Sequence, residues 1–313
     1  MPRVVVTRRL PEPAITALEA TGAEVWISPH DRALEPDELH AAVTGADAVV
    51  TMLHDKIDGV FLDAAGEQLR VVANVAVGYD NVDTDAARER GVRVTNTPGV
   101  LTDATADLAI ALMLAITRRL GEGERRIRSG EPWAWAIDFM LGRGLRGKTL
   151  GIVGYGEIGR AAGARARAFG MEVIHTRRSG GDEPGRVELG ELLERSHVVS
   201  LHCPLTPETR HLIDAGALAR MRGDAYLVNT ARGPVVDEAA LAGALRDGVI
   251  AGAALDVFER EPEVHPGLAG LENVVLVPHL GSATVETRTA MAELAAANVA
   301  AVLRGDDPPT PVV

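Results

Sequence analysis

Residues 150–159 read LGIVGYGEIG, an apolar strand pattern that leads through the spacing Gly-x-Gly-x-x-Gly into a helical stretch at residues 160–169. In this motif Gly154 permits a tight turn, Gly156 lets the backbone approach a pyrophosphate, and Gly159 lets the helix pack close to the strand. The N-terminus of the helix offers its unpaired N–H groups to the phosphates. Three spaced glycines are weak evidence alone, but their position between a strand and a helix predicts a dinucleotide-binding turn.

Short strands alternate with helical stretches on both sides of this motif, and such alternation is typical of parallel sheets with crossover helices. The sequence therefore predicts an α/β chain with two doubly wound parallel sheets, the second of about six strands. The expected strands lie at residues 3–7, 24–28, 48–51, 70–75 and 92–94, and then at 149–154, 171–176, 197–202, 225–229, 250–256 and 273–277.

Two long helical stretches bear on the domain organisation. Residues 101–120, LTDATADLAIALMLAITRRL, are apolar on nearly every face, so this helix must be buried all round. It lies either inside the core of one domain or at a contact between domains or subunits. The Ala-rich stretch at residues 284–303 is expected to pack back onto the first domain. We therefore expect residues 1–98 and 283–313 to form a substrate-binding domain and residues 99–282 a dinucleotide-binding domain.

Composition narrows the class of protein. The 313 residues are 46% hydrophobic, enough to supply a core to each of two domains. The net charge is −12 and the arginines are scattered, which argues against nucleic acid as a partner. No apolar run reaches membrane-spanning length and the N-terminus does not resemble a signal peptide, so a cytoplasmic location without membrane contact is expected. The single cysteine, Cys203, excludes an internal disulfide and a thiolate zinc cage.

Three polar residues follow expected strands of the second sheet: Arg232, Glu261 and His279. Ligands of doubly wound sheets bind at the carboxyl ends of the strands, the edge on which the glycine turn also lies. Reduction of a 2-keto acid by a nicotinamide needs a cation for the carboxylate and a proton donor for the developing alkoxide. A carboxylate beside the histidine favours its charged form and selects which ring nitrogen carries the reactive proton. Taken singly, the arginine and the glutamate fit solvated surface residues equally well.

The segments around these residues carry a family resemblance. NTARGPVVDEAAL contains Arg232, GAALDVFEREP contains Glu261, and VPHLGSAT contains His279, and all three resemble signatures of the D-isomer-specific 2-hydroxyacid dehydrogenases. NVAVGYDNVD at residues 74–83 and VTNTPGVLTDATADLA at residues 94–109 extend the resemblance over essentially the whole chain. Within the family it is closest to the glyoxylate/hydroxypyruvate reductases.

The resemblance implies a Rossmann-type cofactor domain and a flavodoxin-like substrate domain with the active site in a cleft between them. It makes His279 the acid/base, Glu261 its partner and Arg232 the clamp on the substrate carboxylate. The backbone amides of Val77 and Gly78 would complete the carboxylate site, with Leu53 as an apolar wall. Glycine suits position 78 because a backbone that donates to an anion needs room and unusual dihedral angles. An ordinary turn after a strand is the alternative for this loop.

The resemblance also assigns the coenzyme contacts. Asp256 would accept from the nicotinamide carboxamide, while Thr230 and Ala231 would line the ring. Cys203 and Pro204 match a segment on the adenosine side, although a small buried apolar residue explains Cys203 as well. No metal is implied, because His279 lacks neighbouring ligands at coordination spacing. The expected cofactor-binding residues are Gly154, Tyr155, Gly156, Glu157, Ile158, Gly159, Arg177, Arg178, Ser179, Cys203, Pro204, Thr230, Ala231, Asp256 and Gly281.

The end of the second strand of the cofactor sheet bears on the choice of coenzyme. An NAD-binding sheet places Asp or Glu there to bind the ribose 2′-hydroxyl. This chain has Arg177, Arg178 and Ser179 instead, and an Arg pair suits a 2′-phosphate, so NADPH is expected over NADH. Glu157 departs from the family, which commonly has Arg there. Its carboxylate either points to solvent or weakens phosphate binding.

The sequence is also compatible with other functions. Glu261 argues against formate dehydrogenases, which need glutamine there, and the chain ends at Val313 without the regulatory domain typical of phosphoglycerate dehydrogenases. A dehydrogenase for a longer 2-keto acid and a nicotinamide-sensing protein like the corepressors of this superfamily are the alternatives. A homodimer is expected. The cluster of Trp133, Trp135, Phe139 and Met140 either holds that dimer together or approaches an active site.

Overall fold

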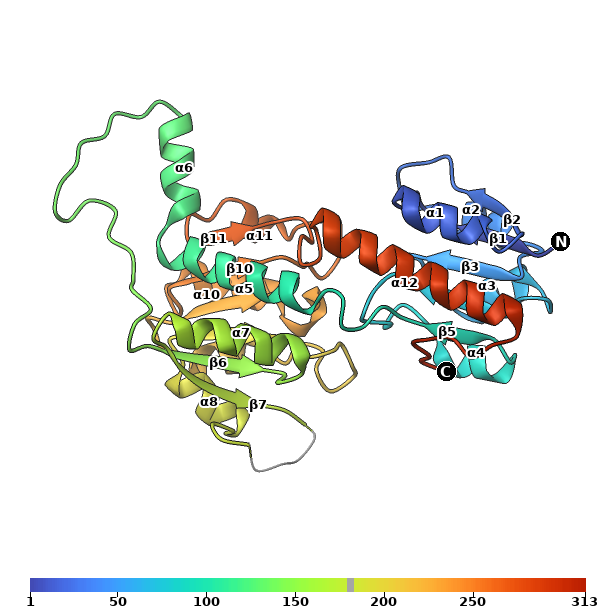
Figure 1. Cartoon of the computed structure of the whole chain (residues 1–313). Coiled ribbons are helices and arrows are strands. Elements are labelled where there is room, and N and C mark those ends of the chain that lie inside the picture. The colour runs from blue at the N-terminus through green and yellow to red at the C-terminus, as the bar shows by residue number, and fades with distance from the viewer. Residues whose placement is uncertain (179–182) are drawn as a thin grey trace. The chain divides into compact units, whose positions relative to one another are not determined.

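The chain folds into two compact units in the computed structural model, which describes residues 1–178 and 183–313 (Figure 1). Unit 1 comprises Met1–Leu101 and Ala283–Val313, and unit 2 comprises Thr102–Ser282. The assignment of these units to substrate and coenzyme stays a prediction. No helix in the described ranges is long and apolar enough to cross a membrane.

Unit 1 contains a five-stranded parallel sheet in the order β2-β1-β3-β4-β5. This is the order of flavodoxin-like doubly wound sheets. The central strands are buried on both faces, which explains why they are continuous apolar runs rather than alternating ones. The strands are β1 (Arg3–Val6), β2 (Glu24–Ile27), β3 (Ala48–Thr51), β4 (Val71–Asn74) and β5 (Arg93–Thr95).

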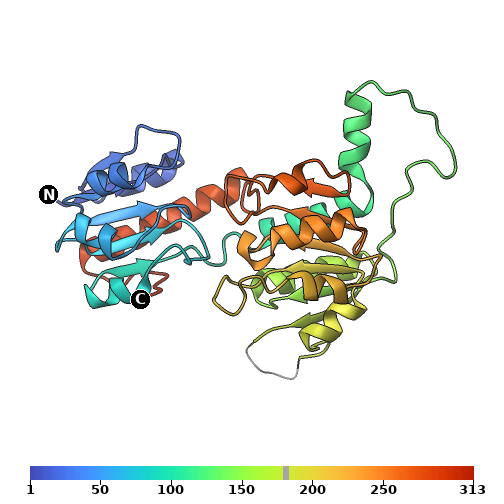
Figure 2. The ribbon, with the colours of Figure 1, turned by 180° about the vertical axis from the view of Figure 1, so that it is seen from behind.

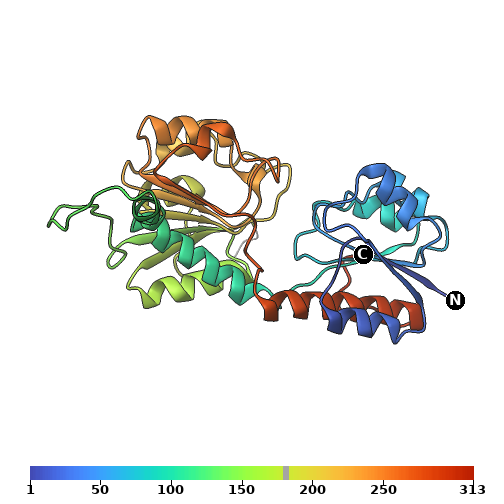
Figure 3. The ribbon, with the colours of Figure 1, turned by 90° about the horizontal axis from the view of Figure 1, so that it is seen from above.

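Helices cover both faces of this sheet (Figure 3). On one face α1 (Glu12–Glu19) packs beside α12 (Val285–Arg304), whose alanines allow a close approach to the strands. The other face is covered by α2 (Pro36–Val43), α3 (Gly59–Ala65) and α4 (Thr84–Glu89). The C-terminal helix therefore packs onto the first hundred residues.

Unit 2 contains a six-stranded parallel sheet in the order β11-β10-β9-β8-β6-β7. A parallel bridge between His175 and Arg186 lies on the outer side of β7 and takes the place of a further strand. With this bridge counted, the order is that of a Rossmann sheet. The strands are β6 (Thr149–Val153), β7 (Glu172–Thr176), β8 (Val198–Leu201), β9 (Tyr226–Asn229), β10 (Gly252–Leu255) and β11 (Val274–Leu276).

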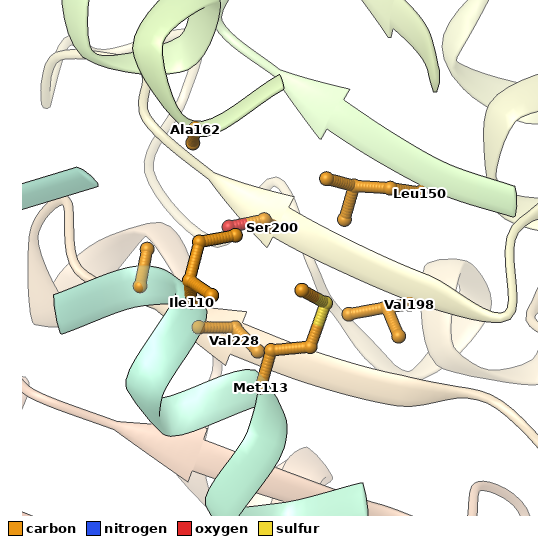
Figure 4. Close-up of a pocket in the computed structure, with 8 residues that line it drawn as sticks. Ile110, Met113, Leu150, Ala162, Val198, Ser200 and Val228 are labelled. Carbon is orange, nitrogen blue, oxygen red and sulfur yellow. The ribbon is translucent and has the colours of Figure 1, made fainter. Parts of the chain in front are cut away.

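Two helical layers enclose the sheet of unit 2 (Figure 2). One contains α5 (Thr102–Thr117) and α7 (Glu157–Ala168), and the other contains α8 (Leu189–Arg195), α9 (Ala215–Arg220), α10 (Glu238–Arg246) and α11 (Pro266–Ala269). Ile110 and Met113 of α5 point toward Leu150, Val198 and Val228 on the sheet (Figure 4). This apolar contact leaves no cavity large enough for water, so it is core rather than a ligand site.

The apolar stretch at residues 101–120 is not one helix. The helix α5 ends at Thr117, Arg119 adopts a left-handed conformation (φ 56°), and α6 (Leu120–Arg128) starts separately. A positive φ cannot continue a right-handed α-helix, so the chain turns at Arg119. The buried face of α5 belongs to the core of unit 2, and a subunit contact on its outer face stays a prediction.

The predicted strands agree with the observed ones to within one or two residues at each end, and the two doubly wound sheets are confirmed. The agreement follows from the burial of parallel strands. Each is a short apolar run bounded by polar or glycine residues, which makes it easy to locate in the sequence.

Candidate active site

The glycine turn after β6 has the geometry that a dinucleotide needs. Gly154 has a φ of 94°, and a Cβ there would lie 2.5 Å from the amide nitrogen of Cys203. A Cβ on Gly159 would overlap the carbonyl oxygen of Gly154. A Cβ on Gly156, by contrast, would meet nothing within 4 Å, so open space lies beside the backbone at the N-cap of α7. Two of the glycines close the turn, and the third leaves room for a ligand.

The segment after β8 lies against this turn. Neighbours of β6 on either side are β7 and β8, so the strand order reverses here, and ligands of doubly wound sheets bind at such a reversal. Cys203 is 9% exposed, and burial raises the pKa of its thiol to about 11. It therefore behaves as a small apolar residue beside the turn, with Pro204 exposed next to it.

Glu157 is exposed, and its carboxylate accepts a hydrogen bond from the Thr102 hydroxyl at 3.2 Å. It occupies the first turn of α7, where the helix dipole favours an anion. This contact with the start of α5 gives the residue a structural role. Ile158 beside it is half-buried.

The arginines after β7 are engaged by carboxylates. Arg177 is paired with Glu183 at 3.1 Å, and Arg178, which is largely exposed, with Glu208 at 3.4 Å. Ser179 lies outside the described residues.

His279 and Glu261 form a hydrogen-bonded pair. The Nδ1 atom of His279 lies 2.9 Å from Oε2 of Glu261, whose other oxygen accepts from the Phe258 amide at 3.1 Å. Burial by itself raises the pKa of Glu261, but the hydrogen bond and charge of His279, the Phe258 amide and the charge of Arg232 together hold it below its usual value. Glu261 is thus ionised at neutral pH and orients the imidazole through Nδ1.

Asp256 holds the backbone that follows His279. Its two carboxylate oxygens accept from the amides of Leu280 and Gly281, the latter at 2.9 Å, and its own carbonyl accepts from the His279 amide at 2.8 Å. His279 itself has a left-handed φ of 53°, a conformation that costs free energy and persists only where neighbours impose it. The carboxylate of Asp256 supplies that constraint. Each oxygen retains a second lone pair, so a role toward a carboxamide stays a prediction.

Arg232 lies in the turn after β9, and Asn229 organises this turn. The Asn229 side chain accepts from the Ala231 amide and donates to the Arg232 carbonyl, both at 3.0 Å. The hydroxyl of Thr230 is buried and has no hydrogen-bond partner among the described residues. A buried unpaired hydroxyl at a strand end fits a site that a ligand completes.

The loops that carry Arg232 and Glu261 are joined to each other. A Cβ on Gly233 would lie closer than 3.0 Å to the carbonyl group of Phe258, so the two backbones touch. The buried Glu238 accepts from the Glu259 amide at 2.8 Å, and Glu259 in turn contacts the ring nitrogen Nε2 of His211. This network fixes the positions of Arg232 and Glu261 relative to each other.

In unit 1 the expected carboxylate-binding loop is held by its carbonyl groups. Asn96 donates to the Val77 carbonyl at 2.9 Å, and Asn74 donates to the Gly78 carbonyl at 3.1 Å. Within the described ranges the amides of Val77 and Gly78 donate no hydrogen bond, which leaves them suited to an anion. Gly78 is not among the glycines with positive φ, so the expected unusual dihedral angle is wrong in that respect. Leu53 is 37% exposed in the turn after β3.

The structure thus gathers Arg232, Glu261 and His279 at the carboxyl ends of β9, β10 and β11, and places Leu53, Val77 and Gly78 after β3 and β4 of unit 1. Sequence reasoning did not single out the residues that hold these loops. Asn74, Asn96 and Glu238 are buried or half-buried polar residues at the ends of apolar strands or helices. That position was the available signal, because most buried polar groups are hydrogen-bonded.

Another such residue is His202 after β8, whose Nε2 lies 2.9 Å from the Ser200 hydroxyl. Its Nδ1 is buried without a partner among the described residues, and burial lowers its pKa to about 4. His202 is therefore neutral at physiological pH.

No group of three or more His, Cys, Asp or Glu side chains in the described part of the chain is arranged to hold a metal ion. The open space beside Gly156, the unpaired hydroxyl of Thr230 and the arginines after β7 fit a dinucleotide. Together with the His–Glu pair, these residues suit proton-coupled hydride transfer.

Comparison with known proteins agrees with this chemistry. Residues 110–281 match the NAD-binding domain of the D-isomer-specific 2-hydroxyacid dehydrogenases. A glyoxylate reductase from Thermococcus litoralis is 48% identical over 320 residues, which cover 98% of this chain and 96% of the relative.

Solved structures cover both units. A glyoxylate reductase from Paecilomyes thermophila is 34% identical with a TM-score of 0.89, covering 99% of this chain and 98% of its own. The NADPH-dependent glyoxylate/hydroxypyruvate reductase from Sinorhizobium meliloti, solved with NADP and malonate, is 34% identical with a TM-score of 0.87. The match covers 100% of this chain and 97% of the reductase chain. The protein is thus an oxidoreductase with a nicotinamide coenzyme, and it belongs to the D-isomer-specific 2-hydroxyacid dehydrogenase family.

Proposed function

We propose that this protein reduces the small 2-keto acids glyoxylate and hydroxypyruvate to D-2-hydroxy acids, with NADPH as the preferred coenzyme. The observation that carries the proposal is the His279–Glu261 pair near the charge of Arg232. Such a pair delivers a proton and the arginine binds an anion, the two functions that reduction of a 2-keto acid requires. The choice of keto acid rests on the likeness to glyoxylate reductases along the whole chain.

In this mechanism the nicotinamide, when bound, supplies the hydride. Glu261 is ionised and accepts at Nδ1 of His279, so Nδ1 carries a proton. The proton for the substrate carbonyl oxygen therefore comes from Nε2, and the imidazole is left neutral with Nδ1 still bonded to Glu261. The planar guanidinium of Arg232 holds the substrate carboxylate by two parallel bonds. In unit 1, the amides of Val77 and Gly78 are proposed as N–H donors for an anionic group of the substrate.

Replacement of His279 by alanine tests the role of the pair. We expect kcat for glyoxylate to fall by about 10²- to 10⁴-fold, because general acid catalysis is lost. Coenzyme binding, measured by fluorescence titration, stays unchanged. Glu261→Gln, which keeps the shape but removes the charge, gives an intermediate loss. His30→Ala, at an exposed histidine of unit 1, serves as the control and leaves kcat unchanged.

The same assays distinguish two alternative functions. If the unmodified protein binds coenzyme but turns over none of a panel of 2-keto acids, it is a nicotinamide-sensing binding protein instead. If kcat/KM rises steadily with the length of the keto acid, it is a dehydrogenase for a longer substrate. A maximum at glyoxylate or hydroxypyruvate supports the proposal.

The preference for NADPH is proposed from Arg177 and Arg178 at the end of β7. Each charge-assisted bond to a 2′-phosphate contributes about 1.5–3 kcal/mol, whereas a carboxylate there would repel it. We expect kcat/KM to favour NADPH, and Arg177→Asp to reverse the order. Equal or NADH-favouring values for the unmodified enzyme would contradict this assignment.

We also propose a homodimer in the cytoplasm that forms through the segment that contains Trp133, Trp135, Phe139 and Met140. This segment exposes large apolar side chains, with Trp135 78% and Ile137 82% exposed. Exposed apolar surface of this kind is typical of an interface. Trp135→Ser with Ile137→Ser should halve the mass measured by light scattering. A change of kcat without a change of mass would instead place the cluster beside an active site, and a monomeric parent protein would exclude the dimer.

A further inference from the structure

Glu183 lies between two guanidinium groups beside β7. Its two carboxylate oxygens accept from Nη1 and Nη2 of Arg160, both at 3.0 Å, and one of them lies 3.1 Å from Nη2 of Arg177. The side chains of Glu183 and Arg177 are 28% and 24% exposed and that of Arg160 is 46% exposed, so the cluster is partly buried at the surface. The carboxylate is shared by both arginines.

The position of Arg160 is imposed by an aromatic stack. Its guanidinium carbon lies 4.9 Å from the centre of the Tyr155 ring, which stacks on His175 with ring centres 3.7 Å apart. A guanidinium over an aromatic face is attracted by the ring quadrupole. Burial lowers the pKa of His175, so its ring is neutral and does not repel the two arginines. Arg160 is therefore held in place before any ligand arrives.

The cluster lies where the adenosine ribose of a dinucleotide is expected. Arg177 directly follows β7, the neighbour of the strand that leads into the glycine turn, and Arg160 directly follows Gly159 of that turn. In Rossmann sheets the end of this second strand faces the ribose 2′ position. A 2′-phosphate at that position would bind the same guanidinium groups that pair with Glu183. The hydrogen bond to Arg160, above all, keeps the pKa of Glu183 below its usual value, so the carboxylate is charged at neutral pH.

We propose that Glu183 acts as a built-in competitor of the coenzyme 2′-phosphate for Arg160 and Arg177, and so limits the preference of this enzyme for NADPH over NADH. This inference rests on the proposed use of a nicotinamide dinucleotide. For NADPH to bind, the carboxylate must leave the arginines or share them with a second anion. NADH carries a neutral 2′-hydroxyl and needs no such exchange. Arg160 and Glu183 thereby join Arg177 as residues that set coenzyme specificity.

The test is calorimetric titration of the full-length protein with NADPH and with NADH, without keto acid. Glu183→Gln keeps the size of the side chain but removes its charge. We expect it to lower the Kd for NADPH about tenfold, as loss of two half-exposed ion pairs implies. The Kd for NADH should change less than about twofold, because the hydroxyl does not compete for the arginines. Glu172→Gln is the matched control, since Glu172 is the first residue of β7 and pairs with Arg195 at 3.3 Å. It should leave both constants unchanged.

A second titration, with 2′,5′-ADP and with 5′-AMP as probes, isolates the ribose end of the coenzyme. Glu183→Gln should tighten binding of 2′,5′-ADP only, and Arg160→Gln should weaken it. If Glu183→Gln leaves NADPH and 2′,5′-ADP unchanged or weakens them while the parent binds both dinucleotides, the competition is refuted and the proposed reductase stands. If the parent binds neither dinucleotide, the proposed function fails and this inference fails with it.

Discussion

Gly233→Ala probes whether contact between the loops of Arg232 and Glu261 assembles the site. The added Cβ would overlap the carbonyl carbon and oxygen of Phe258 and the amide nitrogen of Glu259. All of these are backbone atoms, so no side-chain rotation relieves the clash. The Phe258–Glu259 peptide must move, and its hydrogen bond to the buried Glu238 is then lost.

The expected loss of free energy of unfolding has two parts. Overpacking lowers the free energy of unfolding by about 1–3 kcal/mol, and loss of one hydrogen bond to the buried Glu238 carboxylate lowers it by about 1–3 kcal/mol more. A loss of roughly 4 kcal/mol lowers the unfolding temperature of a unit of this size by about 8–16 °C. Displacement of Glu261 relative to Arg232 by about 1 Å also lowers kcat/KM roughly a hundredfold.

Scanning calorimetry and steady-state rates with glyoxylate measure both effects. Gly243→Ala is the control, because Gly243 lies inside α10 and a Cβ there meets nothing within 4 Å. Alanine at a helix interior stabilises by about 0.5–1 kcal/mol, so this variant should unfold at the same or a higher temperature with unchanged kcat/KM. If Gly233→Ala behaves like Gly243→Ala, the coupling of the two loops is wrong.

Three further predictions concern buried groups of unit 2. Asp256→Ala removes both acceptors for the Leu280 and Gly281 amides and should lower the free energy of unfolding by about 3 kcal/mol. It should lower kcat more than it raises KM. Unfolding and kinetics like those of the wild type would contradict this prediction. The Cys203 thiol, whose pKa burial raises to about 11, should resist an aromatic disulfide reagent at pH 8 until the protein is denatured, and rapid labelling of the native protein would refute its burial. Burial lowers the pKa of His202 to about 4, so this histidine stays neutral in the folded chain. Below about pH 6.5 only the unfolded chain takes up the proton, so the free energy of unfolding falls by up to about 3 kcal/mol by pH 4. His202→Gln should flatten the unfolding temperature between pH 7 and 5, and parallel curves for the two proteins would exclude the effect.

The sequence by itself determined the architecture and the chemical type of the site. Buried parallel strands are short apolar runs between helices, so both sheets could be located from local pattern alone. The glycine turn was equally readable, because its spacing encodes backbone conformations that only glycine tolerates. The nature of the reaction followed from polar residues after strand ends, together with the family resemblance of the segments around Arg232 and His279.

Only the tertiary structure decided what holds these residues and what competes with them. The junction of Gly233 with Phe258, the clamp of Asp256 on the turn after His279, and the capture of Arg160 by Glu183 join residues that no periodic pattern relates. The end of α5 likewise depended on the left-handed turn at its C-terminus, not on its uniform hydrophobicity. Local sequence specifies periodicity and backbone preference, whereas contacts between distant loops depend on how complete layers pack. The residues that position the site and tune its coenzyme arise from that packing.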